Sequence, residues 1–229
     1  AIDWAKGALR WKTALGGRIW SRPVAAARKL LVGCQDGILY GLDAETGQVV
    51  DKIPCGGHIE SDPVAVDGLL VTAMDEPDYG ARYDASTQRR KILGVDLVKK
   101  EMASLIDSEG SLARVPVLSN TEAYFFSEST LYAYDTRARK LAWKYSPGYQ
   151  IAPYPLVYDQ VILLPMNFLR KEGQHSTDVI TLDRRTGREL GRTKTGGVAL
   201  RHYGGGSYAQ HGDLLVTAGY GGMEAFRIS

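Results

Sequence analysis

An aspartate that closes a short apolar segment recurs along this chain of 229 residues, and this repetition limits the possible folds more than any other feature. The five repeated aspartates are separated by 40, 53, 39 and 48 residues, and they are Asp3, Asp43, Asp96, Asp135 and Asp183. A proline that begins an apolar segment recurs in phase, with gaps of 40, 53 and 39, at Pro23, Pro63, Pro116 and Pro155. Two markers that drift together indicate a structural repeat. The last copy, near Ser207, lacks the proline.

Each repeat also contains an apolar run bounded by Gly, Asp, Asn or Lys, which is the pattern of a short β-strand. These runs are Leu30–Val32, Leu69–Val71, Tyr124–Phe126, Val161–Leu164 and Leu214–Val216. With a strand at the proline, one ending at the aspartate and one after the next turn, each repeat supplies four strands, and no window shows a helical period. Four strands in about 40–45 residues are typical of a β-propeller blade. We therefore expect an all-β chain that forms one propeller domain over residues 1–229.

The motif around the aspartates resembles the repeat of the quinoprotein-type, or pyrroloquinoline-quinone-like, propeller family. In that repeat a glycine follows the aspartate after four residues and a tryptophan after eight, as in residues 3–11. Later copies keep part of the motif, with Gly47, Gly187 and Trp143. The resemblance covers nearly the whole chain and implies the propeller fold, but the same repeat serves both enzymes and scaffolds. We expect the aspartates to bond to the turns that follow them, and Trp11 and Trp143 to pack between blades.

Counting strands predicts a ring of five four-stranded antiparallel blades. If the strands of a blade are lettered A to D from the centre outwards, five A, B and C strands follow Ile19, but only four D strands follow internal turns. The fifth D strand would be Ala8–Thr13, paired with the C strand Met223–Ile228. This closure would remove sheet edges that invite aggregation. Because Ala1–Asp3 duplicates the last C strand, a fragment of a larger propeller is the alternative.

Composition excludes several function classes. The 28 basic and 26 acidic residues leave a formal charge of +2, without the concentrated positive charge of a nucleic-acid-binding protein. No apolar run approaches the roughly 20 residues of a membrane-spanning helix. The two cysteines, Cys34 and Cys55, cannot form a zinc pattern, and we expect Cys34 to act as a small buried hydrophobe, with a bridge between the two left open. The four histidines lack metal-ligand spacing, so we expect neither a metal nor another cofactor.

Residues just before each proline should meet at the mouth of the central channel, because they connect the D strand of one blade to the A strand of the next. The B–C hairpins lie at the same end, and both long insertions, Asp75–Lys91 and Asn167–Thr177, fall in them. Loops on such a face usually carry the binding surface of a repeat protein. The predicted binding cluster therefore comprises Trp20, Arg22, His58, Glu60, Asp62, Arg114, Tyr154, His202 and Tyr203. Alternatively, these groups only pair with one another to fill the channel mouth, and the insertions are tolerated surface loops.

The cluster joins arginines suited to carboxylates with flat aromatic surface, and no proton-transfer pair accompanies it. We predict that it recognises a protein partner or a small polar or anionic ligand without turnover. The family resemblance implies three functions, namely a binding scaffold like the lipoprotein propeller of outer-membrane assembly, a sensor domain of a bacterial serine/threonine kinase, or a quinone-dependent dehydrogenase. Family members with the last activity need eight blades, a calcium site, an adjacent Cys-Cys pair and a catalytic aspartate. This chain has neither the length for eight blades nor a Cys-Cys dipeptide. A non-enzymatic binding scaffold is the main prediction, and the sensor domain is the alternative. The resemblance also implies an extracytoplasmic location, in the periplasm or at the cell surface.

Overall fold

The computed structural model describes residues 1–26, 28–59, 61–75, 90–108, 116–119, 121–126, 129–148, 155–169, 175–194, 207–211, 214–219 and 222–227. The chain divides into two compact units. Unit 1 comprises Ala1–Ser127 and Ala133–Ala142, and unit 2 comprises Glu128–Tyr132 and Trp143–Ser229. The expectation of a single domain over residues 1–229 stays a prediction.

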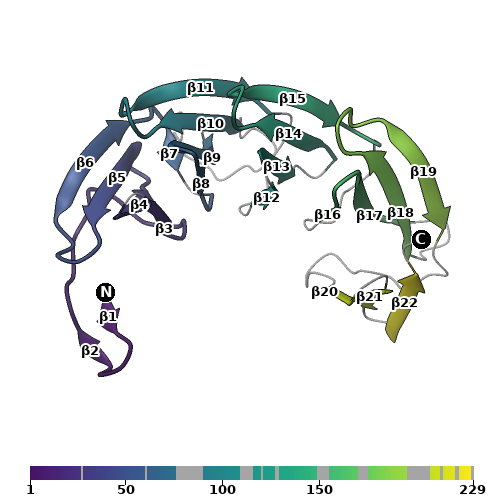
Figure 1. Cartoon of the computed structure of the whole chain (residues 1–229), viewed down its shortest axis with the longest axis horizontal. Helices are drawn as coiled ribbons and strands as arrows, with labels where there is room; N and C mark the ends of the chain where they lie inside the picture. Colours follow the sequence, from purple (N-terminus) through teal and green to yellow (C-terminus); the bar gives the residue numbers. More distant parts are fainter. Residues whose placement is uncertain are drawn as a thin grey trace. The chain divides into compact units, whose positions relative to one another are not determined.

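All regular structure in the described residues is β-strand, arranged in antiparallel sheets in which strands that follow one another in the chain lie side by side (Figure 1). The first sheet has the order β3 (Val24–Ala26), β4 (Lys29–Gly33), β5 (Ile38–Asp43) and β6 (Val49–Pro54). The second has β7 (His58–Ile59) and β8 (Val64–Val66), both paired with β9 (Leu69–Asp75), followed by β10 (Arg90–Asp96) and β11 (Glu101–Asp107). The third has the order β12 (Val117–Ser119), β13 (Glu122–Phe126), β14 (Leu131–Asp135) and β15 (Lys140–Tyr145).

The remaining sheets continue the same plan. The fourth has the order β16 (Leu156–Val157), β17 (Val161–Leu169), β18 (His175–Asp183) and β19 (Glu189–Lys194). The last has β20 (Ser207–His211), β21 (Leu214–Gly219) and β22 (Gly222–Arg227), and a two-stranded ribbon at the N-terminus consists of β1 (Ile2–Asp3) and β2 (Ala8–Leu9). The predicted all-β class with four-stranded antiparallel sheets is confirmed. Each A strand in the first four sheets begins directly after its repeat proline, and each C strand ends at its repeat aspartate.

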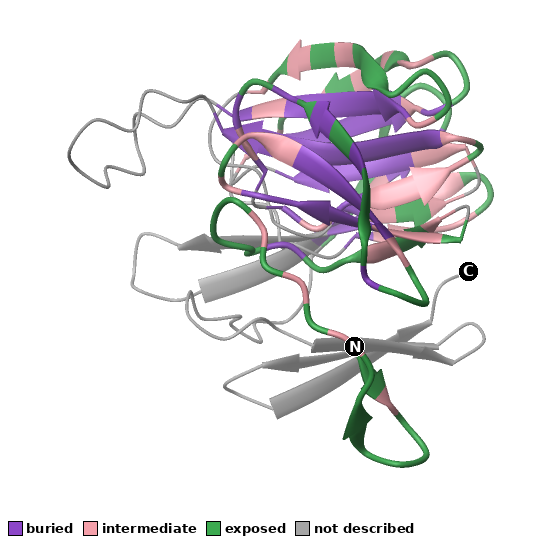
Figure 2. Ribbon diagram, turned by 90° about the vertical axis from the view of Figure 1, so that its left-hand side faces the viewer, coloured by how far each residue is buried: buried purple, intermediate pink, exposed green. Residues whose placement is uncertain are grey.

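Burial follows the strand order within a sheet. The middle strands carry the core of unit 1, with Leu70, Val71, Ile92 and Leu93 fully buried on β9 and β10, because both of their faces are covered. Figure 2 shows the buried residues on these inner strands and exposed residues on the outer strands, the turns and the N-terminal ribbon. Within the part of the chain that the structure describes, no helix is long and apolar enough to cross a membrane.

The repeat aspartates hold the turns between C and D strands, as predicted. Oδ1 of Asp43 accepts hydrogen bonds from the backbone N–H of Glu45 at 3.0 Å and of Thr46 at 2.8 Å. The other four aspartates accept equivalent backbone N–H bonds. Four residues after each aspartate the backbone is left-handed, with φ of +61°, +74°, +60°, +55° and +70° at Gly7, Gly47, Lys100, Arg139 and Gly187. Because a Cβ disfavours this conformation, the lysine and the arginine occupy strained positions.

Two of these turns receive a tryptophan from the preceding repeat. The ring of Trp11 packs on Gly47, where a Cβ would overlap it, and its Nε1 donates to the carbonyl oxygen of Ala44 at 3.2 Å. The ring of Trp143 packs in the same way on Gly187, and its Nε1 donates to the carbonyl oxygen of Arg184 at 3.0 Å. The predicted packing of both tryptophans between repeats is confirmed. Glycine is required beneath each ring for space as well as for φ.

The turns at Lys100 and Arg139 use charge in place of the ring. Asp51 occupies the position that tryptophan holds in residues 3–11, and its carboxylate pairs with Lys100 of the next turn at 2.5 Å and with Lys29 at 2.5 Å. In the following repeat, Arg139 reaches back to the carboxylate of Asp96 at 2.5 Å. Each strained cation is thus offset by an ion pair with a largely buried carboxylate. We use the name inter-repeat locks for four of these contacts: Trp11 with Gly47, Trp143 with Gly187, Asp51 with Lys100, and Asp96 with Arg139.

At the N-terminus, Ala8–Leu9 pairs with Ile2–Asp3. The turn after Asp3 closes this local hairpin, and in it Gly7 N–H donates to the Asp3 carbonyl oxygen at 2.8 Å. The described pairing of β22 is with β21. The five-blade count, the closure and the alternative of a larger propeller stay predictions.

The two predicted insertions differ from expectation. Residues 167–169 and 175–177 are not loop but extend β17 and β18, with Asn167 opposite Thr177 and Leu169 opposite His175. The antiparallel ladder simply continues, because each added pair satisfies more backbone hydrogen bonds. In the first insertion, β9 ends at Asp75 and β10 begins at Arg90, and residues 76–89 lie outside the described residues. Cys34 and Cys55 are both buried and free, so the expectation for Cys34 is confirmed and no bridge joins them.

Candidate functional site

In unit 1, the turn between β4 and β5 lies between two strand connections. On one side, Gln35 N–H donates to the carbonyl oxygen of Arg18 at 3.0 Å, and Ser21 Oγ donates to that of Gly33 at 3.2 Å. On the other side, Ile59 N–H donates to the carbonyl oxygen of Cys34 at 3.2 Å. These bonds bring together three segments, residues 18–22, 33–38 and 54–59. We call the three segments together the rim site.

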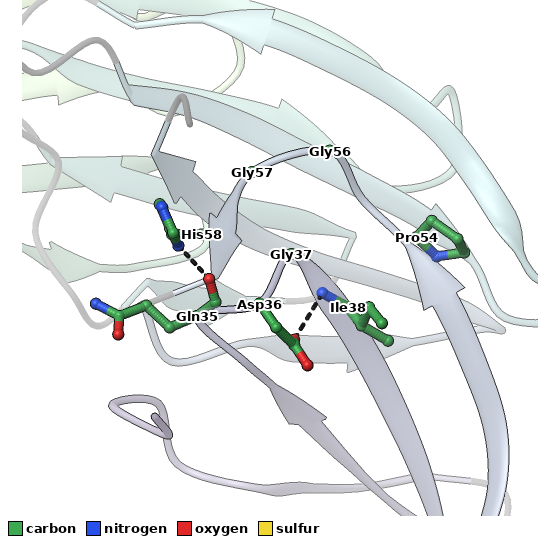
Figure 3. Close-up of a pocket in the computed structure, with 8 residues that line it drawn as sticks. All are labelled: Gln35, Asp36, Gly37, Ile38, Pro54, Gly56, Gly57 and His58. Carbon is green, nitrogen blue, oxygen red and sulfur yellow. Dashed lines mark hydrogen bonds between the residues drawn. The ribbon is translucent and has the colours of Figure 1, made fainter. Parts of the chain in front are cut away.

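The rim site contains an open pocket of about 420 Å³ (Figure 3). Its lining comes from the β4–β5 turn and from the connection between β6 and β7, and consists of Gln35, Asp36, Gly37, Ile38, Pro54, Gly56, Gly57 and His58. This volume falls within the range of small-ligand sites. The lining combines one carboxamide, one carboxylate, one imidazole, two apolar side chains and three glycines.

Three glycine backbones form much of the pocket wall. Gly37 and Gly56 have φ of +82° and +80°, so ordinary side chains are disfavoured there. At Gly57 a Cβ would collide with the carbonyl oxygen of Asp75 and would lie 2.9 Å from Cγ of Met74. A Cβ at Gly56 would meet no atom within 4 Å, so the pocket is open at that point.

Asp36 carries the formal negative charge of the pocket. Its Oδ1 accepts a hydrogen bond from the backbone N–H of Ile38 at 3.1 Å, and its Oδ2 accepts one from the hydroxyl of Tyr40 at 2.6 Å. Partial burial opposes ionisation, but the bonds from Tyr40, Cys34 and Ile38 outweigh it and hold the pKa of Asp36 below its usual value. Asp36 is therefore an oriented carboxylate that is ionised at neutral pH.

His58 lines the pocket, and on the second sheet it is the first of three polar residues on neighbouring strands, followed by Asp75 and Arg90. Its Nδ1 bonds to the carbonyl oxygen of Gln35, and the residue lies opposite Asp75 in the pairing of β7 with β9. Asp75 in turn pairs with Arg90 on β10, with Oδ1 2.6 Å from Nε. Both of these side chains are buried, and their ion pair joins the end of β9 to the start of β10.

Arg22 and Asp62 join the two connections that flank the rim site. The backbone N–H of Arg22 donates to Oδ1 of Asp62 at 2.7 Å, and its Nε lies 3.5 Å from Oδ2. The Asp62 side chain is 16% exposed, whereas that of Arg22 is 83% exposed. Mutual pairing, the alternative interpretation of the predicted cluster, thus holds for this pair, but the guanidinium remains open to solvent.

The structure brings four of the nine predicted site residues to this region. Trp20, Arg22, His58 and Asp62 lie in or beside the rim site, and Trp20 is 50% exposed next to the exposed Ile19. The other five lie outside the described residues, so the complete cluster stays a prediction; they are Glu60, Arg114, Tyr154, His202 and Tyr203.

Sequence reasoning missed most of the pocket lining. Gln35–Ile38 and the two glycines before His58 are absent from the predicted cluster, because that cluster was taken from residues next to the prolines. The dipeptides Asp36-Gly37 and Gly56-Gly57 are turn signals that could have identified these segments as loops. They could not have shown that the two loops face each other.

Comparison with known proteins agrees with the repeat assignment. Residues 1–91 match the repeat family described as "Outer membrane protein assembly factor BamB". The crystal structure of BamB from Moraxella catarrhalis superimposes with a TM-score of 0.59 at 18% identity, covering 96% of this chain and 63% of that one. The fold is therefore that of a β-propeller. The resemblance to pyrroloquinoline-quinone-like propeller repeats that the sequence predicted is confirmed, by the family match over residues 1–91 and by the propeller fold of the superimposed structure.

Two curated proteins share shorter segments. The outer membrane protein assembly factor BamB of Shewanella oneidensis is 33% identical over 72 residues, which are 31% of this chain and 18% of that protein. The β-alanine-activating enzyme of Drosophila melanogaster is 36% identical over 64 residues, which are 28% of this chain and 6% of that protein. The chain thus matches only a small part of the length of either curated relative.

Proposed function

We propose that this chain is a non-enzymatic scaffold that binds a protein partner through the rim site, in an extracytoplasmic compartment. The observation that carries the proposal is the pocket between the β4–β5 turn and the β6–β7 connection, beside the exposed pair Ile19 and Trp20. A half-exposed tryptophan next to a pocket is the kind of anchor that protein interfaces use. An exposed guanidinium, that of Arg22, adds a group suited to carboxylates.

The comparisons support this proposal at the level of family. The repeat family and one curated relative bear the name of an outer membrane protein assembly factor, and an assembly factor for proteins has proteins as its partners. The thiols of the rim site, Cys34 and Cys55, are buried, and burial raises the pKa of each, so neither is an activated nucleophile. Recognition, and not turnover, is what such a lining supports.

Photo-crosslinking in the source cells tests the proposal. Benzoylphenylalanine in place of Trp20 is expected to give a discrete adduct with one protein. The same residue in place of Val98 is the matched control, because Val98 is 81% exposed and lies in the turn between β10 and β11, at the opposite end of the strands. No adduct is expected there.

Reversing the charge of two arginines provides a second experiment on the same proposal. Replacing Arg22 and Arg114 together with glutamate is expected to weaken the adduct formed at position 20 while the circular dichroism spectrum is unchanged. An adduct at position 98 alone, or none at position 20 in folded protein, would overturn the assignment of the face. Reduction of an artificial electron acceptor by alcohols, after addition of pyrroloquinoline quinone and Ca²⁺, would overturn the non-enzymatic assignment.

A further inference from the structure

We infer that the protein partner presents an acidic segment to residues 18–22 of the rim site, where Arg18 and Arg22 bind carboxylates on either side of Ile19 and Trp20. We call residues 18–22 the arginine segment. The inference rests on the proposed function and names the chemistry of the partner. It follows from the distribution of charge along the chain, from the bonds that hold this backbone and from the side chains that remain exposed.

Positive charge is concentrated in the part of the chain that contains the arginine segment. Residues 4–35 include seven lysines and arginines and no aspartate or glutamate. The other 197 residues include 21 basic and 26 acidic residues, so the formal charge of +2 is unevenly distributed. A region with one sign of charge attracts partners of the opposite sign. The surroundings of the arginine segment therefore favour an anionic partner.

Three hydrogen bonds hold the backbone of the arginine segment in place. The carbonyl oxygen of Arg18 accepts a bond from the backbone N–H of Gln35 at 3.0 Å. Ser21 is buried, and its Oγ donates to a carbonyl oxygen of β4 at 3.2 Å. The backbone N–H of Arg22 donates to Oδ1 of Asp62 at 2.7 Å. Because this loop is fixed at both ends and near its middle, a partner that binds it has little backbone left to order.

The two arginines keep N–H donors available to a partner. Arg18 is exposed and, among the described residues, forms no ion pair. Arg22 contacts Asp62 through Nε alone, and its side chain is 83% exposed, so the two Nη groups face solvent. Arg139 differs from both, because its Nη1 is already paired with the buried carboxylate of Asp96. A planar guanidinium with free Nη groups matches a carboxylate in shape and charge.

Apolar surface between the arginines favours a protein segment over a free small anion. Ile19 is 48% exposed and Trp20 is 50% exposed, and the two lie between Arg18 and Arg22 in the sequence. Tryptophan and arginine are the residues that most often dominate the energy of protein interfaces. Four residues of extended chain span at most about 13–14 Å. An extended partner segment with two acidic residues four positions apart, and apolar residues between them, therefore fits this surface.

Nuclear magnetic resonance with synthetic peptides tests the inference. The peptide acetyl-Glu-Leu-Leu-Ser-Glu-amide is titrated into ¹⁵N-labelled protein, and the indole N–H signal of Trp20 and the amide signals of Ile19 and Arg22 are expected to shift with saturation. The matched peptide acetyl-Gln-Leu-Leu-Ser-Gln-amide has the same shape without the charge and is expected to bind about tenfold more weakly. Equal binding of the two peptides would overturn the inference. Stronger binding of an octamer of thymidylate than of the acidic peptide would overturn it as well.

Three variants test whether the two arginines are the site. Arg18→Gln and Arg22→Gln are each expected to weaken binding of the acidic peptide about two- to fivefold, as for a single exposed ion pair. Arg22→Gln keeps the backbone N–H that donates to Asp62, so the loop should keep its conformation. Arg28→Gln is the matched control, because Arg28 is an exposed arginine in the turn between β3 and β4, at the other end of these strands. An equal loss of binding with Arg28→Gln would overturn the inference.

The outcomes distinguish the inference from the proposed function. If either variant of the arginine segment fails to fold, the comparison of the acidic peptide with the neutral one still decides. An adduct at position 20 without preference for the acidic peptide would refute the acidic segment and leave the scaffold standing. Preference for the acidic peptide without any adduct would support the arginine segment and refute the scaffold.

Discussion

Replacing Gly47 with alanine tests the inter-repeat locks, with Gly68→Ala as the matched control. The two glycines have nearly equal φ, +74° and +77°, and both lie in turns of unit 1. At Gly68 the nearest atom to an added Cβ is Cγ2 of Val98 at 3.4 Å, whereas at Gly47 the Cβ would overlap the ring of Trp11. The difference between the two variants therefore reports the docking of the ring.

The magnitudes follow from the two costs. A Cβ at left-handed φ costs about 1–2 kcal/mol, and the reduced freedom of the unfolded chain returns about 0.4–1 kcal/mol, so Gly68→Ala should lower the free energy of unfolding by roughly 1 kcal/mol. Forcing a methyl group into a packed contact costs about 1–3 kcal/mol more. Gly47→Ala should therefore lower the free energy of unfolding by about 2–4 kcal/mol.

Equilibrium unfolding in urea measures both values, and a double-mutant cycle completes the test. In a Trp11→Ala background the ring is gone, so Gly47→Ala should fall to roughly the cost of Gly68→Ala, about 1 kcal/mol. Equal effects of the two alanine variants in the unaltered chain would refute the ring docking. So would a cost of Gly47→Ala that is independent of residue 11.

Three further predictions concern titratable groups. Lys100 and Lys29 hold the pKa of Asp51 below its usual value in the folded protein. The stabilisation from this carboxylate is therefore present above the ordinary carboxyl pKa of about 4, and it is lost as the pH falls through the lower pKa of the folded state. Asp51→Asn should reduce the dependence of Tm on acid pH. Burial, and after it the hydrogen bond to Glu189, raises the pKa of Tyr145 to about 12. The stabilisation from the protonated Tyr145 is therefore present below the ordinary tyrosine pKa of about 10, and it is lost as the pH rises through about 12. Tyr145→Phe should remove the change in tyrosine absorbance near that pH. Burial raises the pKa of Cys55 to about 11, so its thiol should react with a disulfide reagent only after unfolding, and rapid reaction in native protein would contradict this.

The sequence predicted most of the strand plan, because the markers are tied to local physics. A proline suits the residue before an A strand, and an aspartate binds the backbone of the turn that follows it. These requirements are met within a few residues, as at Pro23 and Asp43, so they can be recognised in the sequence. The extension of β17 and β18 escaped prediction because polar pairs such as Asn167 and Thr177 carry no apolar alternation.

The candidate site was less predictable, because it depends on which loops face each other. The bond between His58 and the Gln35 carbonyl joins residues 23 positions apart and involves a backbone group that every residue possesses. The ion pair of Arg22 with Asp62 spans 40 positions, which is one repeat, and the sequence placed both residues in the cluster without pairing them. Side-chain identity identifies candidates, but only the fold identifies partners.

The inter-repeat locks also bear on how such a chain can evolve. Each lock matches a residue of one repeat to the turn of the next, so a tryptophan must face glycine and Asp51 must face a cation. Exchanging neighbouring repeats would set Trp11 against the left-handed Lys100, or leave Asp51 buried opposite a glycine. The side chains at the inter-repeat locks therefore determine which repeat can follow which. A duplication or deletion by recombination would require compensating substitutions in both neighbours before the chain could fold stably.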